Sequence, residues 1–229
     1  DVRLVGSEMC IRDRLNISVK SSEISDEVSP EIFDSLSVEV SALGVETSLQ
    51  KKISGYPVIA DEWMIVTANA YASIAGAEIL KDGGTAADAM VAAQTVLGLV
   101  EPESSGLGGG GFLVWYDSNT KQVTTLDGRE TAPSSSQVSQ FQNKDGESMK
   151  FFEAVIGGLS VGTPGIPALM FEAHKKWGNK QWGQLFAYGI GLSENGFMVS
   201  NKLSSSIQRD LERLKTCLLY TSPSPRDGH

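Results

Sequence analysis

Two adjoining stretches of the chain consist largely of apolar and small side chains, with alanine the most frequent residue, a pattern typical of helices. This pattern predicts helices over residues 69–81 and 86–100. The glycine pair 83–84 suits the end of the first helix. Thr85 suits the N-cap of the second helix, with Asp88 in its first turn. We expect tight packing, because both helices are rich in small residues: Ala72, Ala75, Gly76, Ala86, Ala87, Ala89, Ala92 and Ala93.

Runs of β-branched and aromatic residues predict strands in three places. Residues 113–117 and 123–129 are joined by the turn residues 118–121, so we expect an antiparallel hairpin. Arg129 lies at the end of the second strand. Residues 64–67 predict one further short strand, ahead of the first helix.

After a polar stretch that reaches about residue 150, the pattern becomes helical again. Pro164 and Pro167 are compatible with the first turn of a helix that Gly178 ends. Its apolar face is expected to consist of Leu169, Met170, Ala173 and Trp177. Residues 181–192 and 201–214 predict two further helices, the last with a core stripe of Leu203, Ile207, Leu211 and Leu214. Helices, a hairpin and helices again indicate a layered α+β fold.

The two ends of the chain differ in origin from the rest. Residues 217–222 are the translation of CTGTCTCTTATACACATCT from its second base, a string similar to the transposon end used to fragment DNA for sequencing. Residues 223–227 continue into the adapter, and its opposite strand translates to residues 4–13. We therefore expect residues 1–14 and 217–229 to be adapter-derived and exclude them from fold reasoning. The natural insert is then a fragment.

Removing both ends changes the cysteine count and leaves the charge unchanged. Both cysteines, Cys10 and Cys217, lie in the adapter-derived ends, so the insert offers no disulfide, metal-ligating thiol or thiol nucleophile. The formal net charge of −9 survives, because acidic and basic residues balance in the ends. An acidic chain argues against nucleic acid as a partner. No apolar run reaches the roughly 18–20 residues of a membrane span.

Residues 15–62 differ in composition from the residues that follow. Within this stretch, residues 21–46 are rich in Ser, Val, Asp and Glu and hold few aromatic residues. Such a composition is typical of a solvated leader or linker that is partly disordered. Residues 63–216 are expected to form the folded part.

A glycine-rich segment follows the second predicted helix. Gly106, Gly108 and Gly111 satisfy the pattern G-x-G-x-x-G, which suggests a dinucleotide site. In such sites the glycines follow a strand and open a helix, so that phosphate meets the helix N-terminus. Here they follow a helix and open a strand. The run of four glycines at 108–111 indicates a place where other backbone passes very close, or where a positive φ is needed.

Four motifs together resemble a known family. GAEILKDGGTAADAMVAA, VEPESSGLGGGGF, LDGRETAP and SVGTPGIPAL occur in this order. Their sequence and spacing are similar to the N-terminal part of the γ-glutamyltranspeptidase family, over about residues 63–214. Thr85 stands where the family usually has Asn, and Glu103 where it usually has His or Gln. Neither departure touches the expected chemistry.

The resemblance implies an αββα sandwich of the N-terminal-nucleophile hydrolase type, made as one precursor that cuts itself into a large and a small subunit. The new N-terminal threonine of the small subunit attacks the γ-glutamyl amide of glutathione, and its α-amino group acts as the base. Water or an amino acid then accepts the γ-glutamyl group. This threonine lies outside the chain, so no catalytic residue is expected here, and the fragment alone is expected to be inactive.

One substrate-binding residue carries over from the family. Arg129 matches the arginine that holds the α-carboxylate of the glutamyl donor. A planar guanidinium holds a carboxylate through two parallel hydrogen bonds, which Lys cannot provide. The competing interpretation is an ordinary ion pair with Glu130. The intact motif favours the substrate-binding interpretation.

The remaining polar residues favour structural roles. His174 is expected on a helix surface without an Asp or Ser partner, and Asp88 is expected to complement a helix dipole. Ser104 and Ser105 are compatible with lining the site or with a turn. Neither the residues nor the resemblance points to a metal or a cofactor.

Three functions from different classes remain open on the sequence. The first is a γ-glutamyl hydrolase and transferase acting on glutathione and other γ-glutamyl compounds. The second is an acylase of the same superfamily, of the cephalosporin or poly-γ-glutamate type. The third is a non-catalytic relative. The expected partners are a small-molecule substrate and the small subunit of the same precursor. The family suggests a periplasmic or extracellular location.

Overall fold

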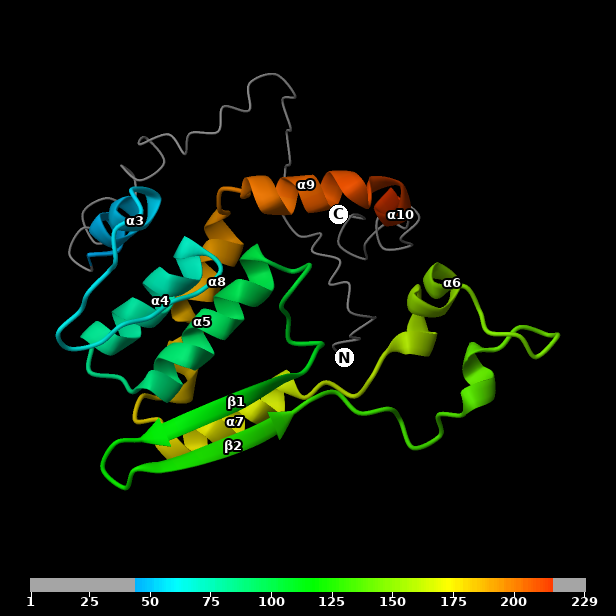
Figure 1. The fold of residues 1–229 in the computed structure, drawn as a ribbon, viewed down its shortest axis with the longest axis horizontal. Helices are drawn as coiled ribbons and strands as arrows, with labels where there is room; N and C mark the ends of the chain where they lie inside the picture. Colours follow the sequence, from blue (N-terminus) through cyan, green and yellow to red (C-terminus); the bar gives the residue numbers. More distant parts are fainter. Residues whose placement is uncertain (1–43, 216–229) are drawn as a thin grey trace, which may run out of the picture.

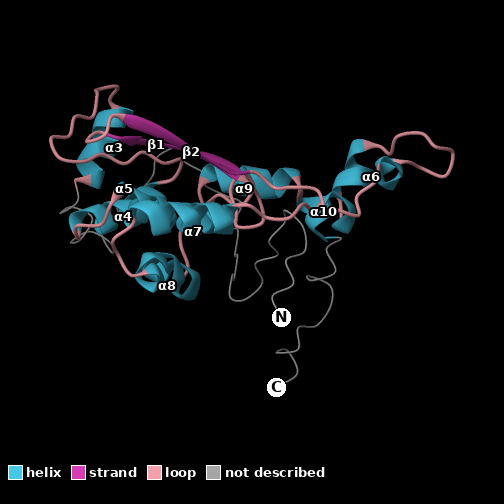
Figure 2. Cartoon of the chain, turned by 90° about the horizontal axis from the view of Figure 1, so that it is seen from below, coloured by secondary structure: helices cyan, strands magenta, loops and turns pink. Residues whose placement is uncertain are grey.

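A computed structural model describes residues 44–215 of the chain. The described part is an α+β arrangement in which helices cover one face of a two-stranded hairpin (Figure 1). Its main elements are α3 (Val45–Ile53), α4 (Ala70–Lys81), α5 (Ala86–Val100), β1 (Gly111–Asp117), β2 (Gln122–Gly128), α7 (Ile166–Trp177), α8 (Ala187–Asn195), α9 (Asn201–Arg209) and α10 (Leu211–Lys215). Figure 2 shows the hairpin over a layer formed by α4, α5 and α7, with α8 beneath that layer.

The helices α4 and α5 pack closely, as their small residues predict. Asn69 caps α4 by accepting a hydrogen bond from the backbone N–H of Tyr71 at 3.0 Å. Thr85 and Asp88 form a capping box at the start of α5. A Cβ atom on Gly76 would lie 3.1 Å from the carbonyl oxygen of Ala89, so these two backbones nearly touch. One core cluster is formed by Ala72, Ala75, Ala92, Ala93, Val96 and Val100.

The hairpin forms in the expected place, with Gly111 paired to Gly128 and Asp117 paired to Gln122. One face lies on α7, where Trp115 stacks on Trp177 with ring centroids 4.6 Å apart. The opposite face is exposed and largely apolar: it carries Phe112, Val114, Tyr116 and Val123, with Thr125 and Asp127 as its polar members. Alternation along β1 therefore separates a face packed on α7 from a bare face.

The helix α7 anchors a second core cluster. Val91 of α5, Ile166 and Met170 of α7, and Leu185 are all buried against one another. Leu169 and Ala173 are also buried, and Gly178 ends the helix, as the sequence predicts. The stretch 181–192 begins instead as a 3₁₀ helix, η3 (Trp182–Phe186), before α8. The expected helix over 201–214 is divided at Asp210 into α9 and α10.

The strand expected over residues 64–67 is absent, and that prediction is wrong. The side chains do alternate: Ile65 packs against the α4–α5 core, whereas Met64 and Val66 are exposed. A strand also needs a neighbouring backbone to hydrogen-bond, and the hairpin is the sheet of the described residues. Residues 64–67 have no such partner among the described residues.

Two regions lie beside the main body. The chain between β2 and α7 runs outward in Figure 2 and carries η1 (Val138–Phe141), α6 (Phe151–Val155) and η2 (Gly158–Ser160). Phe151 and Phe152 of this region are exposed. The helix α3 contacts α4 and falls within residues 15–62, the segment expected to be a leader or linker.

Candidate functional site

Three backbone segments meet where β2 ends. The carbonyl oxygen of Gly109 accepts hydrogen bonds from the backbone N–H groups of Gly165 and Ile166, at 3.0 and 3.1 Å. Thr131 and Thr163 exchange two backbone hydrogen bonds, with the shorter one, from Thr163 N–H, at 2.8 Å. The glycine-rich segment, the residues after β2 and the start of α7 are therefore held together.

This junction requires glycine at two positions. A Cβ atom on Gly165 would lie 2.9 Å from the carbonyl oxygen of Arg129 and still closer to that of Gly128. A Cβ atom on Gly110 would lie 2.7 Å from the Cα atom of Arg129. Real Cβ atoms essentially never come within 3.0 Å of another residue's atoms. The expectation that the glycine run admits another backbone is confirmed at Gly110.

Arg129 lies directly after β2, at the edge of this junction. Its backbone N–H donates to Oδ1 of Asp127 at 3.0 Å, which fixes the turn out of the strand. Its guanidinium Nη2 forms an ion pair with Oε1 of Glu130 at 2.8 Å, and its side chain is 55% exposed. The ion pair considered as the competing interpretation is therefore present. An exposed guanidinium held by one carboxylate also remains accessible to a second anion.

A hollow of about 250 Å³ lies between β2 and α7, and it is lined by Leu126, Asp127, Gly128, Arg129, Gly165, Ala168, Leu169 and Glu172. Arg129 is the residue of this lining that carries a positive charge, so a carboxylate ligand would be attracted to its guanidinium. We therefore place the candidate site at the guanidinium of Arg129.

Glu130 is less exposed than Arg129, with 33% of its side chain exposed. Its Oε2 atom is buried and has no hydrogen-bond partner among the described residues. The carboxylate lies against Gly110, and a Cβ atom on Gly162 would lie 3.2 Å from its Cβ and Cγ atoms. Glycines on two sides thus leave room for the carboxylate that pairs with Arg129.

The start of the glycine-rich segment is held in place by the buried carboxylate of Glu101. It accepts hydrogen bonds from Nδ2 of Asn69 at 3.1 Å and from Nζ of Lys202 at 2.7 Å. Burial acts to raise the pKa of Glu101, but the hydrogen bonds from Lys202 and Asn69 outweigh it and place the pKa below its ordinary value. Lys202 also lies 3.5 Å from Glu103. The start of the segment is thus tied to α4 and α9.

The two serines of this segment take turn positions. The backbone N–H groups of Ser104 and Ser105 donate to the carbonyl oxygen of Glu101, at 3.1 and 3.0 Å. The hydroxyl of Ser105 accepts a hydrogen bond from Nε2 of Gln94 at 2.7 Å. These contacts favour the turn role over a role in lining the site.

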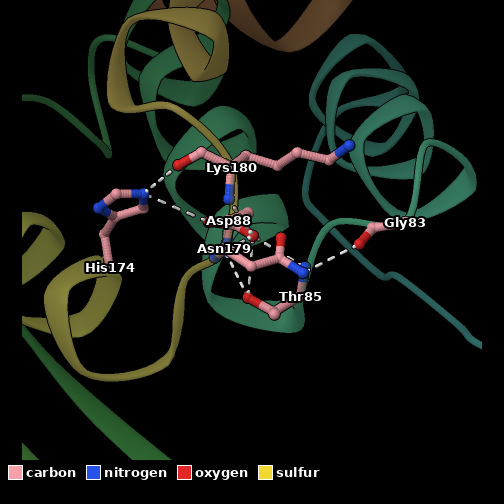
Figure 3. A network of polar contacts seen from close by, with 6 residues as sticks. All are labelled: Gly83, Thr85, Asp88, His174, Asn179 and Lys180. Carbon is pink, nitrogen blue, oxygen red and sulfur yellow. Dashed lines mark hydrogen bonds and ion pairs between the residues drawn. The ribbon is translucent and has the colours of Figure 1, made fainter.

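A polar network joins the start of α5 to the end of α7 (Figure 3). Asp88 is fully buried, and its Oδ2 accepts from the backbone N–H groups of Thr85 and Asn179, at 2.9 and 3.0 Å. His174 donates from Nε2 to the carbonyl oxygen of Lys180 at 2.8 Å, with Oδ1 of Asp88 3.5 Å away. The sequence-based view of His174 as a surface residue without an Asp partner is wrong. The partner lies 86 positions away in the sequence and on another helix, so local spacing does not reveal it.

No group of three or more His, Cys, Asp or Glu side chains could hold a metal ion within residues 44–215. Over the same residues no helix is both long and apolar enough to cross a membrane.

The chain matches the family model described as "Gamma-glutamyltranspeptidase" over residues 72–225. The match covers more than half of the chain, so the chain belongs to the γ-glutamyltranspeptidase family. The matched range runs past residue 216, the boundary expected for the natural insert. That boundary stays a prediction.

Curated relatives are glutathione hydrolases. The chain is 40% identical over 156 residues to the glutathione hydrolase proenzyme of Bacillus subtilis, covering 68% of this chain and 27% of that protein. It is 33% identical over 193 residues to human glutathione hydrolase 7, covering 82% of this chain and 28% of that protein. The chain thus spans about a quarter of the length of these relatives.

The fold is also similar to solved structures of γ-glutamyltranspeptidases. The described fold is similar to Helicobacter pylori γ-glutamyltranspeptidase, with a TM-score of 0.65 and 33% identity over 69% of this chain and 45% of that one. It is also similar to the Pseudomonas nitroreducens enzyme complexed with L-DON, with a TM-score of 0.64 and 30% identity over 69% of this chain and 46% of that one. The α+β fold therefore matches γ-glutamyltranspeptidase structures over part of the chain.

Proposed function

We propose that the chain is a large-subunit fragment of a precursor that cleaves the γ-glutamyl amide of glutathione and related compounds. The observation that carries this proposal is the position of Arg129 directly after β2, with its side chain exposed. Its guanidinium is exposed and is oriented by Glu130 at 2.8 Å. The family match and the glutathione hydrolase relatives support the same function.

In the proposed reaction Arg129 binds the donor, and the chemistry takes place on the missing subunit. The guanidinium holds the α-carboxylate of the γ-glutamyl group through two parallel hydrogen bonds. A threonine hydroxyl of the small subunit attacks the γ-carbonyl carbon while its own α-amino group takes the proton. The amine of the donor leaves with a proton. Water or an amino acid then releases the γ-glutamyl group from the acyl-enzyme.

The bare face of the hairpin supports the proposed αββα sandwich. Phe112, Val114 and Tyr116 of β1 are 60–71% exposed on one face. A contiguous apolar strand face is normally covered in a folded protein. We propose that a second sheet, completed by the small subunit, packs on this face. The periplasmic or extracellular location suggested by the family remains part of the same proposal.

An acylase function receives less support from the solved structures. The cephalosporin acylase of Bacillus halodurans is similar to this chain with a TM-score of 0.55 and 28% identity. Both values are lower than those for the two γ-glutamyltranspeptidases. Arg129 also favours a donor that bears a free α-carboxylate.

Maturation of the complete precursor tests the proposal against a non-catalytic relative. The precursor, rebuilt from the downstream coding sequence, should cut itself into two chains, and the second should begin with threonine. Mass spectrometry of the purified protein measures both. A precursor that stays uncut, or a second chain that begins with a residue lacking a hydroxyl or thiol, would contradict the proposed function.

A further inference from the structure

We propose that Gly110 is a positioning residue that determines donor specificity. Its lack of a side chain lets the glycine-rich segment lie against the backbone of Arg129 and Glu130. This contact sets where the guanidinium of Arg129 meets the α-carboxylate. The inference rests on the proposed function and adds to it a residue that does not touch the donor.

The atoms that face Gly110 are mostly backbone atoms. A Cβ atom built on Gly110 would collide with the backbone nitrogen of Glu130 and with its Oε2 atom, and would lie 2.7 Å from the Cα atom of Arg129. The Oε2 atom belongs to a side chain and is able to shift. The nitrogen and the Cα atom belong to the residues that carry the site. Adding a methyl group at Gly110 therefore moves the backbone of Arg129.

The glycine-rich segment cannot easily retreat from this contact. Gly109, its neighbour, accepts two hydrogen bonds from the start of α7. On the other side, Thr131 is tied to Thr163 through two backbone hydrogen bonds. The residues between these ties, Arg129 and Glu130, must absorb the displacement. A misplacement of about 1 Å in a substrate-positioning group costs on the order of 100-fold in rate.

Other glycines provide matched controls of graded severity. A Cβ atom on Gly106 meets nothing within 4 Å, and one on Gly109 lies 3.7 Å from the nearest atom, the carbonyl oxygen of Gly106. A Cβ atom on Gly162 would lie 3.2 Å from Glu130, an intermediate case. These three glycines and Gly110 all lie outside the positive-φ region, so alanine is compatible with their backbone. The alanine substitutions at these four positions therefore differ mainly in how closely the added methyl group approaches Arg129 and Glu130.

The test compares two donors in the complete, matured precursor: γ-glutamyl anilide and the analogue that lacks the α-carboxylate. Gly110→Ala should raise KM for γ-glutamyl anilide by about 10- to 100-fold. It should change the slow turnover of the analogue by less than about threefold, because the analogue does not use Arg129. Gly162→Ala should raise the same KM by a few-fold, on the order of 2- to 5-fold. Gly106→Ala and Gly109→Ala should match the parent.

Two results would overturn the inference. In the first, Gly110→Ala has the same KM as Gly106→Ala. In the second, both donors lose turnover equally, which indicates a general structural role. If Gly110→Ala fails to fold, Gly162→Ala decides the question through the same donor selectivity, and an unchanged KM there overturns the inference. A parent precursor without turnover of γ-glutamyl anilide would instead refute the proposed function.

Discussion

At the residue scale, the role of Arg129 depends on geometry as well as charge. The side chain is exposed and paired with Glu130, so charge alone would make it an ordinary surface ion pair. An ordinary ion pair would not require the close backbone contacts that Gly110 and Gly165 make beside Arg129. A residue whose main chain is enclosed and whose side chain is open is well suited to bind a ligand.

Substituting Arg129 in the complete precursor tests this role. Arg129→Lys keeps the charge and loses the planar fork, whereas Arg129→Ala loses both. Both variants should raise KM for glutathione, by a binding loss on the order of 1.5–3 kcal/mol, while self-cleavage continues. Steady-state kinetics and the ratio of cut to uncut chains measure the two effects. The structural ion-pair interpretation would be right if Arg129→Ala abolished folding and Arg129→Lys behaved like the parent.

At the element scale, capping and pairing signals of short range were predictable, and partners distant in the sequence were not. Thr85 and Asp88 stand three residues apart, so the capping box at α5 follows from sequence. The contact between Asp88 and His174 joins two helices that no local pattern connects. Residues 64–67 show the converse case, because their alternation is present and the partner that would make them a strand is absent from the described residues. The site follows the same rule: the DGRE motif identifies Arg129, whereas its contact with Gly110 requires the fold.

The network at Asp88 should contribute strongly to stability. Asp88→Ala removes the buried acceptor of the backbone N–H groups of Thr85 and Asn179, at a cost of about 1–3 kcal/mol. Thermal unfolding of the complete precursor measures the loss as a lower Tm. Asp82→Asn is the matched control, because the pair of Asp82 with Lys180 involves an exposed carboxylate and should contribute little. Equal Tm values for the two variants would contradict the assignment.

The tie between α9 and the glycine-rich segment should depend on pH. The pKa of Glu101 is lowered in the folded state, so its contribution to stability is present above the unfolded value of about 4.5 and is lost as pH falls through the folded value. Lys202→Met removes a partner that lowers this pKa. The variant should therefore be less stable than the parent at pH 7, and the difference should shrink below about pH 4.5. Urea midpoints across pH 3–8 measure it, and a pH-independent difference would be inconsistent with this tie.

At the scale of the whole molecule, the proposal makes the chain one part of a larger unit. It spans about a quarter of the length of its curated relatives, and one hairpin face is apolar and bare. Expressed alone, residues 44–215 should aggregate or unfold partly, because exposed apolar faces and open strand edges associate. Size-exclusion chromatography and a thermal melt measure this. A monodisperse monomer with a sharp cooperative melt would count against the proposed sandwich.

The most direct measurement of the central claim is the release of aniline from γ-glutamyl anilide by two matched proteins. The complete, matured precursor should show saturable turnover, because the proposal gives it both Arg129 and a threonine nucleophile on the small subunit. Residues 44–215 alone should show none, because the proposed nucleophile lies outside them. Turnover by the fragment, or an inactive precursor that has matured correctly, would contradict the account.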